Sequence, residues 1–297
     1  MNVIWLIEKY MFEYATELIE TIKESGAKCQ VFDDTANTFD FKRSIQSKYS
    51  DRDCVIFYGS LQRGRQIHNQ TNFIPGVFLT IDNYECSKYY GYYGNHLVNS
   101  KYILLGLNDV KRNIDKIFEQ FNTPSIFIRP SNGYKTFTGQ LLPKDNFETE
   151  FKILCNSYGG LDPTQLVLIA PQQKIVEENR FIVFNIEDHN QIIDGNTYMV
   201  NGELVKSRKT DDLALAFAQS VVDLYTPDKA FTIDIAKMED NSYKILEIGS
   251  FCCAGWYNMN LEKVVHATNK LALAEFSDYW NLPKLAELCY GKPIRHI

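Results

Sequence analysis

The sequence of 297 residues lacks most of the patterns that would assign a class directly. Its seven cysteines are scattered, odd in number and without a pair of CxxC spacings, which argues against structural zinc and indicates a reduced protein. Neither GxGxxG nor GxxxxGK followed by Ser or Thr occurs, so the Rossmann and P-loop fingerprints are absent. No apolar run approaches the roughly 18 residues that a membrane span needs.

Basic charge is also in deficit. Lys and Arg total 31 against 37 Asp and Glu, and the resulting net charge of -6 argues against binding a phosphate backbone by bulk charge. The N-terminal stretch reaches Glu8 after only a few apolar residues, which predicts a first strand rather than a signal peptide. These features predict a cytoplasmic protein without a nucleic-acid or membrane partner.

The composition that remains, 45% hydrophobic and 23% charged, is ordinary for a globular protein. The length allows two or three small domains, or one large domain with insertions. Helical spacing over residues 12–25, among short apolar segments, predicts an open α/β sheet. The segments predicted as its strands are residues 3–7, 29–32, 54–58 and 77–80.

Three other stretches carry local predictions. Residues 35–51 are polar and predict a loop with a short helix, and another short helix is predicted after Pro283. The aromatic run YYGYYG at residues 89–94 predicts either a segment packed under the sheet edge or part of a substrate-facing surface. Asn108 is predicted to cap a helix that ends near Phe121.

A basic stretch with a turn follows that helix. A strand over residues 126–128 leads to Arg129, and after the turn at residues 130–133 a strand-like segment carries Lys135. Backbone amides in such a turn can hold phosphate oxygens while the two cations neutralise charge. The alternative is a surface hairpin with solvated basic side chains.

Two later stretches are also informative. The apolar strand over residues 166–170 runs into a proline turn, as in an adenine-binding hinge or in an ordinary connection between strands. Residues 191–205 predict a hairpin with a turn at Asp194-Gly195 and a second turn at Asn201-Gly202. Asn-Gly between apolar runs is the strongest short signal for a hairpin.

Two acidic residues in an apolar hairpin are the most informative feature of the sequence. Asp234 lies in the predicted strand 231–236, and Glu247 lies in the return strand 243–248. A carboxylate in an apolar strand is costly unless it is paired, hydrogen-bonded or bound to metal. The two acids therefore indicate a buried pair or a site for a divalent cation. The glycine-containing loop 249–255 follows at once, and ligands are usually met at such loops.

Taken in order, these stretches resemble the ATP-grasp superfamily. The sequence FIRPSNGYKTFTG at residues 127–139 is similar to phage and bacterial members of a divergent clade related to the eukaryotic cell division cycle protein 123 family. The resemblance continues through VEENRFIVFN and through the acidic hairpin, over roughly residues 102–257. It implies an α/β protein, α+β in its C-terminal part, with the ATP-grasp fold behind an N-terminal α/β domain. The implied division is a pre-ATP-grasp domain at 1–107, a linker helix and lid at 108–170, and a nucleotide- and metal-binding part at 171–297.

The resemblance also implies roles for single residues, with ATP and Mg²⁺ as cofactors. Arg129 and Lys135 would contact the ATP phosphates, and the strand end at Ile169, Ala170 and Gln172 would bind adenine through backbone groups. The residues near the base and ribose would be Lys174 and Glu178. The catalytic residues, facing the phosphates or an acyl phosphate, would be Arg180 and Arg208. The metal ligands would be Asp234 and Glu247, with Ser250 or water replacing an Asn that many family members carry where Gly249 stands.

The activity that the resemblance implies is ATP-dependent carboxylate–amine ligation. ATP would phosphorylate a substrate carboxylate, and an amine would attack the acyl phosphate to give an amide, ADP and phosphate. The carboxylate and amine substrates are not identified by any motif, and a protein or peptide is among the candidates. The alternative is an ATP-binding assembly factor with slow or no turnover, and a kinase would share the same nucleotide site.

Overall fold

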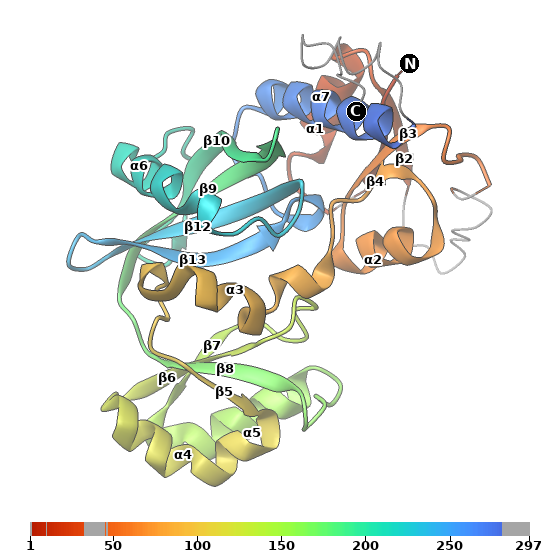
Figure 1. The fold of residues 1–297 in the computed structure, drawn as a ribbon. Coiled ribbons are helices and arrows are strands. Elements are labelled where there is room, and N and C mark those ends of the chain that lie inside the picture. Colours follow the sequence, from red (N-terminus) through yellow and green to blue (C-terminus); the bar gives the residue numbers. More distant parts are fainter. Residues whose placement is uncertain (1, 10, 33–44, 46, 281–297) are drawn as a thin grey trace.

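The computed structural model describes residues 2–9, 11–32, 45 and 47–280, which form three β-sheets with helices packed on their faces (Figure 1). Most of the stretch predicted as a loop over residues 35–51, and the short helix predicted after Pro283, lie outside the described residues.

The first sheet is parallel, in the order β2-β1-β3-β4. Alternate residues of the central strand β1 face opposite sides, so Trp5 packs with Leu18 of α1 and Leu6 packs with Ile67 of α2 in separate clusters. Burial on both faces explains the nearly unbroken apolar runs, and the predicted α/β class is confirmed. The elements are β1 (Ile4–Glu8), α1 (Ala15–Glu24), β2 (Lys28–Phe32), β3 (Cys54–Tyr58), α2 (Leu61–Gln70) and β4 (Ile74–Gly76).

The strand predicted over residues 77–80 is wrong. Strand β4 ends at Gly76, and the next residues leave the sheet in a turn in which Leu79 N–H bonds to Val77 C=O at 3.0 Å. The backbone N–H of Thr80 bonds instead to the Asp228 side chain, at 2.7 Å. Residues 77–79 are apolar because they are buried against the rest of the molecule, which a short apolar run cannot distinguish from strand pairing.

The second sheet is antiparallel, in the order β5-β8-β6-β7, and we call residues 103–171 the lid. Helices α4 and α5 cover one face, where Ile126 and Ile169 are fully buried. The predicted N-cap at Asn108 is wrong, because Gly106 occupies that position and Asn108 N–H bonds to Pro163 C=O at 2.9 Å. The elements are β5 (Ile103–Gly106), α4 (Leu107–Phe121), β6 (Ser125–Pro130), β7 (Gln140–Pro143), α5 (Phe147–Ser157) and β8 (Leu166–Pro171).

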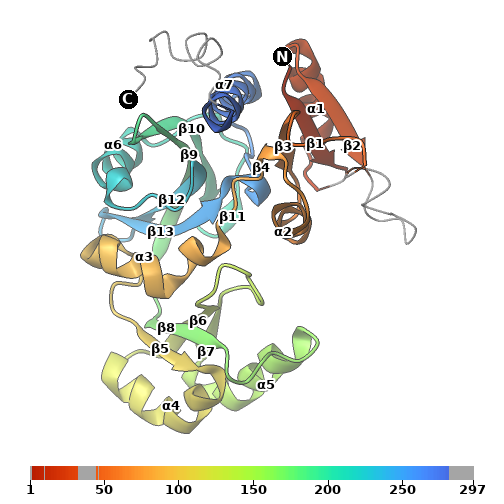
Figure 2. The ribbon, with the colours of Figure 1, turned by 45° about the vertical axis from the view of Figure 1, so that its right-hand side comes forward.

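The third sheet is antiparallel, in the order β11-β10-β9-β12-β13, and lies between the other two parts (Figures 1 and 2). The predicted turn at Asp194-Gly195 is wrong, because β10 continues through an irregularity in its pairing with β9. The Asn201-Gly202 turn is confirmed, and both of its residues have positive φ, 50° and 82°. The elements are β9 (Ile175–Ile186), β10 (His189–Val200), β11 (Glu203–Leu204), α6 (Asp212–Val221), β12 (Ala230–Met238), β13 (Tyr243–Ser250) and α7 (Leu261–Tyr279).

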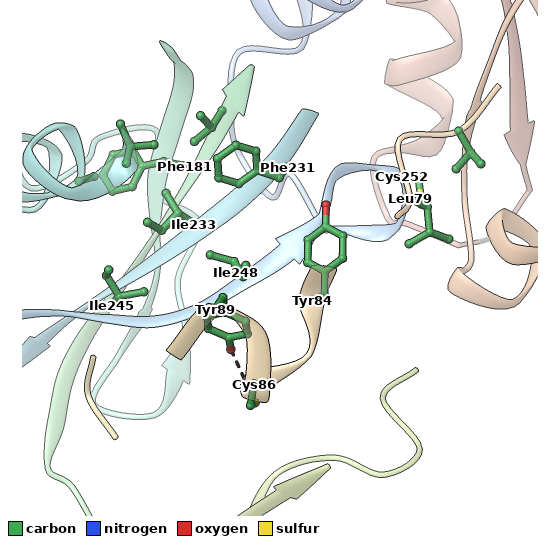
Figure 3. Packing of buried hydrophobic residues seen from close by; sticks show 14 of the residues in the cluster. Leu79, Tyr84, Cys86, Tyr89, Phe181, Phe231, Ile233, Ile245, Ile248 and Cys252 are labelled. Carbon is green, nitrogen blue, oxygen red and sulfur yellow. Dashed lines mark hydrogen bonds between the residues drawn. The ribbon is translucent and has the colours of Figure 1, made fainter. Parts of the chain in front are cut away.

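The main core fills the face of the third sheet that carries Phe231, Ile233 and Ile248 (Figure 3). Helix α3 (Cys86–Tyr93) supplies Tyr89 to this core, and Tyr89 is 0% exposed. The aromatic run over residues 89–94 is thus helical at first, and its packing interpretation agrees with the burial of three of its tyrosines. These are Tyr89, Tyr90 and Tyr93.

The segment after β13 joins the third sheet to the first, and we call residues 251–257 the junction loop. Gly59 N–H bonds to Cys252 C=O at 2.8 Å, and Tyr58 O–H donates to Ala254 C=O at 2.7 Å. Trp256 N–H donates to the hydroxyl of Tyr14 at 2.7 Å. The ends of the parallel strands are therefore fixed next to the loop that follows Glu247.

Candidate active site

Three charged residues lie in one row across the third sheet. Asp234 on β12 pairs with Arg180 on β9 and with Glu247 on β13. Residues paired directly across antiparallel strands project from the same face. The row therefore projects from one face, opposite the face that carries Ile233 and Ile248. The two acids that sequence alone singled out are neighbours on that face.

The pair Arg180–Asp234 is held by two parallel hydrogen bonds. Arg180 Nε donates to Asp234 Oδ1 at 2.8 Å and Nη2 donates to Oδ2 at 2.7 Å, while Nη1 donates to Gly255 C=O at 3.2 Å. Burial works against the charge, but Asp234 outweighs it and raises the pKa of Arg180 above its usual value. A guanidinium has five N–H groups. These three bonds leave one N–H on each terminal nitrogen, which is a fork suited to an oxyanion.

Two tyrosines and a third carboxylate surround this pair. The rings of Tyr198 and Tyr257 stack 4.8 Å apart, and the Arg180 guanidinium carbon lies 5.1 Å and 5.4 Å from their centroids. Tyr198 O–H bonds to Glu178 and lies 3.3 Å from Asp234 Oδ2. Burial raises the pKa of Glu178; the bond from Tyr198 opposes the rise, and the charge of Asp234 adds to it. Sequence reasoning missed both tyrosines, because neither belongs to a motif.

The lid contributes two cations to the same row. Arg129 Nη2, at the end of β6, lies 3.2 Å from Glu247 Oε2, and Lys135 Nζ lies 3.7 Å from Oε1. Burial alone would raise the pKa of Glu247, but Lys135, Arg129 and Arg180 together lower it to about 2. Glu247 is therefore ionised at neutral pH. Lys135 lies in a loop with φ of 50°, so the predicted strand-like segment around it is wrong.

We call residues 131–139 the lid loop, and it is docked on the first part of the chain. Ser131 C=O accepts a bond from Cys86 N–H at 2.7 Å, and Arg65 lies over the ring of Tyr134 at 4.2 Å. A Cβ on Gly133 would lie only 2.5 Å from Ile81 C=O, so this position needs glycine for close approach. A cavity of about 20 Å³ separates the lid loop from residues 248–250 and 253.

The predicted adenine hinge lies in and after strand β8. Ile169 pairs on both sides, with Ile103 and Ile128, and its side chain is in the lid core. Ala170 pairs with Phe127, and Gln172 N–H donates to Ser125 C=O at 3.1 Å. Lys174 follows at the start of the chain segment into β9, where its exposed ammonium pairs with Glu239 at 3.1 Å. Strand pairing thus already engages much of the backbone predicted to bind adenine.

Two predicted residues lie apart from the row. Ser250 projects from the opposite face of β13, where its hydroxyl donates to Phe78 C=O at 2.9 Å. Arg208, on the segment between β11 and α6, lines a surface hollow near the N-terminus of α7. On the side of Glu247, Gly249 faces Thr232, and a Cβ at Gly249 would lie 2.8 Å from Thr232 Oγ1. A larger side chain in place of Gly249 would therefore displace the threonine.

The donor set fits Mg²⁺ with a nucleotide rather than a closed protein cage. Mg²⁺ prefers oxygen ligands and usually takes one or two carboxylates together with substrate phosphates and water. Asp234 and Glu247 are paired across neighbouring strands and face the same side. Within the part of the chain that the structure describes, no group of three or more His, Cys, Asp and Glu side chains is placed to hold a metal ion.

Comparison with solved structures identifies the fold as ATP-grasp. D-cycloserine synthetase superposes with a TM-score of 0.59 at 15% identity, over 91% of this chain and 100% of that one. D-alanine–D-alanine ligase from Coxiella burnetii gives 0.60 at 11% identity, over 98% and 100%. N5-carboxyaminoimidazole synthetase from Staphylococcus aureus, complexed with ADP, gives 0.54 at 16% identity, over 84% and 69%.

The family within this fold follows from the sequence. Residues 108–267 match a family model described as an ATP-grasp domain, the second family of its clade. The match spans more than half of the chain, so the protein belongs to this ATP-grasp family. A search of curated proteins gives no match. In the described residues, no helix combines the length and the apolar character needed to cross a membrane.

Proposed function

We propose that the protein is an ATP-dependent carboxylate–amine ligase that works through an acyl-phosphate intermediate. The observation that carries this proposal is the row of Arg180, Asp234 and Glu247, joined by Arg129 and Lys135 from the lid. It combines carboxylates for a cation with cations for phosphate groups in one place between two sheets. Each of the three ATP-grasp structures compared above is a synthetase or ligase by name, which supports the reaction class.

Asp234 and Glu247 are the residues that would hold Mg²⁺. A bound Mg²⁺ supplies a positive charge that offsets the phosphoryl charge developing during transfer. Arg129 and Lys135, which pair with Glu247 in this structure, would contact the nucleotide phosphates. The lid loop would then bring Lys135 and its backbone amides over those phosphates. Close packing at Gly133 excludes water from that side of the site.

Arg180 is the residue that we propose to hold the reacting group. Its side toward Asp234 is fixed by two bonds, and Gly255 holds a third N–H. The remaining fork could accept two oxygens of a carboxylate or a phosphoryl group without any change of side-chain conformation. A donor group fixed in advance stabilises developing negative charge without the cost of reorganisation.

The chain divides, in this proposal, into a pre-ATP-grasp domain, a lid and a nucleotide-binding part. The pairing of β5 with β8 places residues 103–106 in the lid sheet. We therefore propose a boundary just before β5 rather than after residue 107. Adenine would bind where β8 passes into β9, with Lys174 and Glu178 on the side of the base and ribose.

The test combines nucleotide binding with turnover. The double variant Asp234→Asn with Glu247→Gln should lose Mg²⁺-dependent ATP binding and the release of ADP in the presence of pooled amino acids and peptides. A matched control is Asp188→Asn with Glu203→Gln, two exposed acids that make the same change in charge. Unchanged binding in the first double variant would refute the metal site. ATP binding by the wild type without ADP release for any acceptor would contradict the ligase and favour an assembly factor.

A further inference from the structure

A large polar groove lies beside the candidate active site. It has a volume of about 1050 Å³ and runs between α1, the first turns of α7 and the strand β10. Figure 2 shows α7 between β10 and α1, so the start of α7 forms the floor of the groove and the other two elements form its walls. Pockets for drug-sized ligands measure about 300–1,000 Å³. This groove is therefore large for a single amino acid and suits a short chain.

The groove carries more negative than positive charge. Glu17 and Glu24 of α1 line one wall, and both are exposed. Asp194 and Lys263 line the other side but pair with each other at 3.4 Å. Over the lining residues, four carboxylates stand against two cations, because Glu262 and Arg208 also take part. The groove is thus acidic mainly along α1.

The groove continues past Arg208. A second hollow of about 490 Å³ shares Asp194, Arg208 and Lys263 with the first, so the two form one path along the surface. The segment with Arg208 is fixed by backbone bonds, since Thr197 N–H donates to Lys209 C=O at 3.0 Å. An elongated path lined mostly by polar side chains fits an extended peptide better than a compact metabolite.

The groove begins where the charged row ends. Asn258, which lines it, directly follows Tyr257, whose ring lies by the Arg180 guanidinium. Arg180 itself pairs with Asn196, two residues along β10 from the groove residue Asp194. A chain lying in the groove would therefore reach the proposed reacting group with its end or with a long side chain.

We propose that this groove binds the amine substrate, and that this substrate is a cationic peptide segment. The inference rests on the proposed ligase function. The wall of α1 attracts protonated lysine side chains or an N-terminal ammonium, and one such amine passes Tyr257 to meet the acyl phosphate. Arg208 contacts this acceptor in the groove rather than the nucleotide.

The test measures binding of a fluorescein-labelled tetralysine by anisotropy, with the same label on tetraglutamate and on the uncharged peptide Gly-Ser-Gly-Ser. Tetralysine should bind best, and added salt should weaken it. The double variant Glu17→Gln with Glu24→Gln should weaken it about threefold to tenfold, as expected for two exposed charge pairs. ATP binding should not change, which separates this result from failure of the nucleotide site.

The matched control is Glu13→Gln with Glu20→Gln. These two acids lie on or next to the same helix, are exposed and do not line the groove, so the net charge changes equally. The control should keep wild-type affinity for tetralysine. Equal loss in both double variants would show bulk attraction only and would overturn the proposal. Tetralysine binding no tighter than the uncharged peptide would overturn it as well.

Discussion

At the scale of single residues, the charges of the row are balanced locally. Arg129, Lys135 and Arg180 face Asp234 and Glu247, and Glu178 lies beyond Tyr198. Buried charges are tolerated only when they are paired and hydrogen-bonded, and each of these side chains has such a partner. Removing one member of the row therefore leaves a charge uncompensated, and its effect extends to the others.

Tyr198 tests this dependence without altering a charge. The substitution Tyr198→Phe removes the donor shared by Glu178 and Asp234, in a side chain that is only 5% exposed. Loss of a buried donor should lower the free energy of unfolding by about 1–3 kcal/mol. Urea denaturation at neutral pH measures this. Tyr92→Phe, at a ring that is 63% exposed, is the control and should be neutral. Equal stability of both variants would contradict the prediction.

Glu247 gives a pH dependence with a defined sign. Its pKa falls from 4.5 to about 2 on folding, so its ionised form stabilises the fold above pH 4.5, and this contribution is lost as the pH falls through 2. At neutral pH, Glu247→Gln should therefore be less stable than the wild type. The difference should shrink between pH 4.5 and 2 in urea titrations. A difference that stays constant over this range would show that the ion pairs with the lid do not stabilise the fold.

At the scale of elements, the lid loop depends on backbone contact more than on side chains. Its position follows from one hydrogen bond to Cys86, the stacking of Arg65 on Tyr134, and the missing Cβ at Gly133. Such contacts break and form more easily than a packed core, and loops over active sites are commonly drawn from regions of low local stability.

Gly133→Ala should loosen this loop. The added Cβ would meet Ile81 C=O at 2.5 Å and Tyr84 Cβ at 3.1 Å, and such overpacking costs about 1–3 kcal/mol. Amide hydrogen exchange over residues 131–139 should become faster, and ATP affinity should fall. Gly91→Ala, in helix α3 where nothing lies within 4 Å, is the matched control and should be neutral or stabilising. Unchanged exchange in Gly133→Ala would contradict the docked position.

Sequence reasoning found the elements whose signal is local. The acids Asp234 and Glu247 stand out in apolar strands, and Asn201-Gly202 has a turn chemistry of its own. It failed where tertiary contacts decide. Asn108 has capping chemistry, but carbonyl groups from residues 163 and 165 already bind the first amides of α4. Asp194-Gly195 has turn chemistry, but pairing with β9 on one side keeps β10 continuous.

The candidate site shows the same limit. Sequence and resemblance placed Arg129, Lys135 and Arg180 near the acids, and the structure brings all three to the row. The direction of a side chain from a strand depends on register, which includes the irregularity between Asp234 and Ile235. The orientation of Ser250 away from Glu247 could therefore not be predicted. Tyr198 and Tyr257 are 59 positions apart by their numbers, and no local pattern connects them.

At the scale of the whole molecule, an aromatic cluster joins the parallel sheet to the third sheet. Trp256 of the junction loop is 0% exposed and lies against the rings of Tyr58 at 4.3 Å and Phe251 at 5.3 Å between centroids. Residues from both parts belong to the same core cluster, including Trp5 and Ile182. The two parts should accordingly unfold together.

Trp256→Ala tests this coupling. Truncating a fully buried tryptophan should cost about 3–5 kcal/mol and separate the unfolding of the two parts into two transitions. Urea denaturation followed by circular dichroism and tryptophan fluorescence would resolve them. Trp280→Ala, at a ring that is 38% exposed, is the control and should keep a single transition. A loss below about 1 kcal/mol for Trp256→Ala would contradict the coupling.

The junction loop has a consequence for how such a chain can diverge. Its bonds to Gly59, Tyr58, Tyr14 and Arg180 use peptide groups of the loop, not its side chains. The information that fixes its shape is therefore written elsewhere in the chain, at the residues that supply hydroxyls and a guanidinium. Drift at the half-exposed positions 253 and 255 would leave those bonds in place, whereas loss of one tyrosine hydroxyl would not. Alignments centred on the loop alone would then underestimate how far relatives share its geometry.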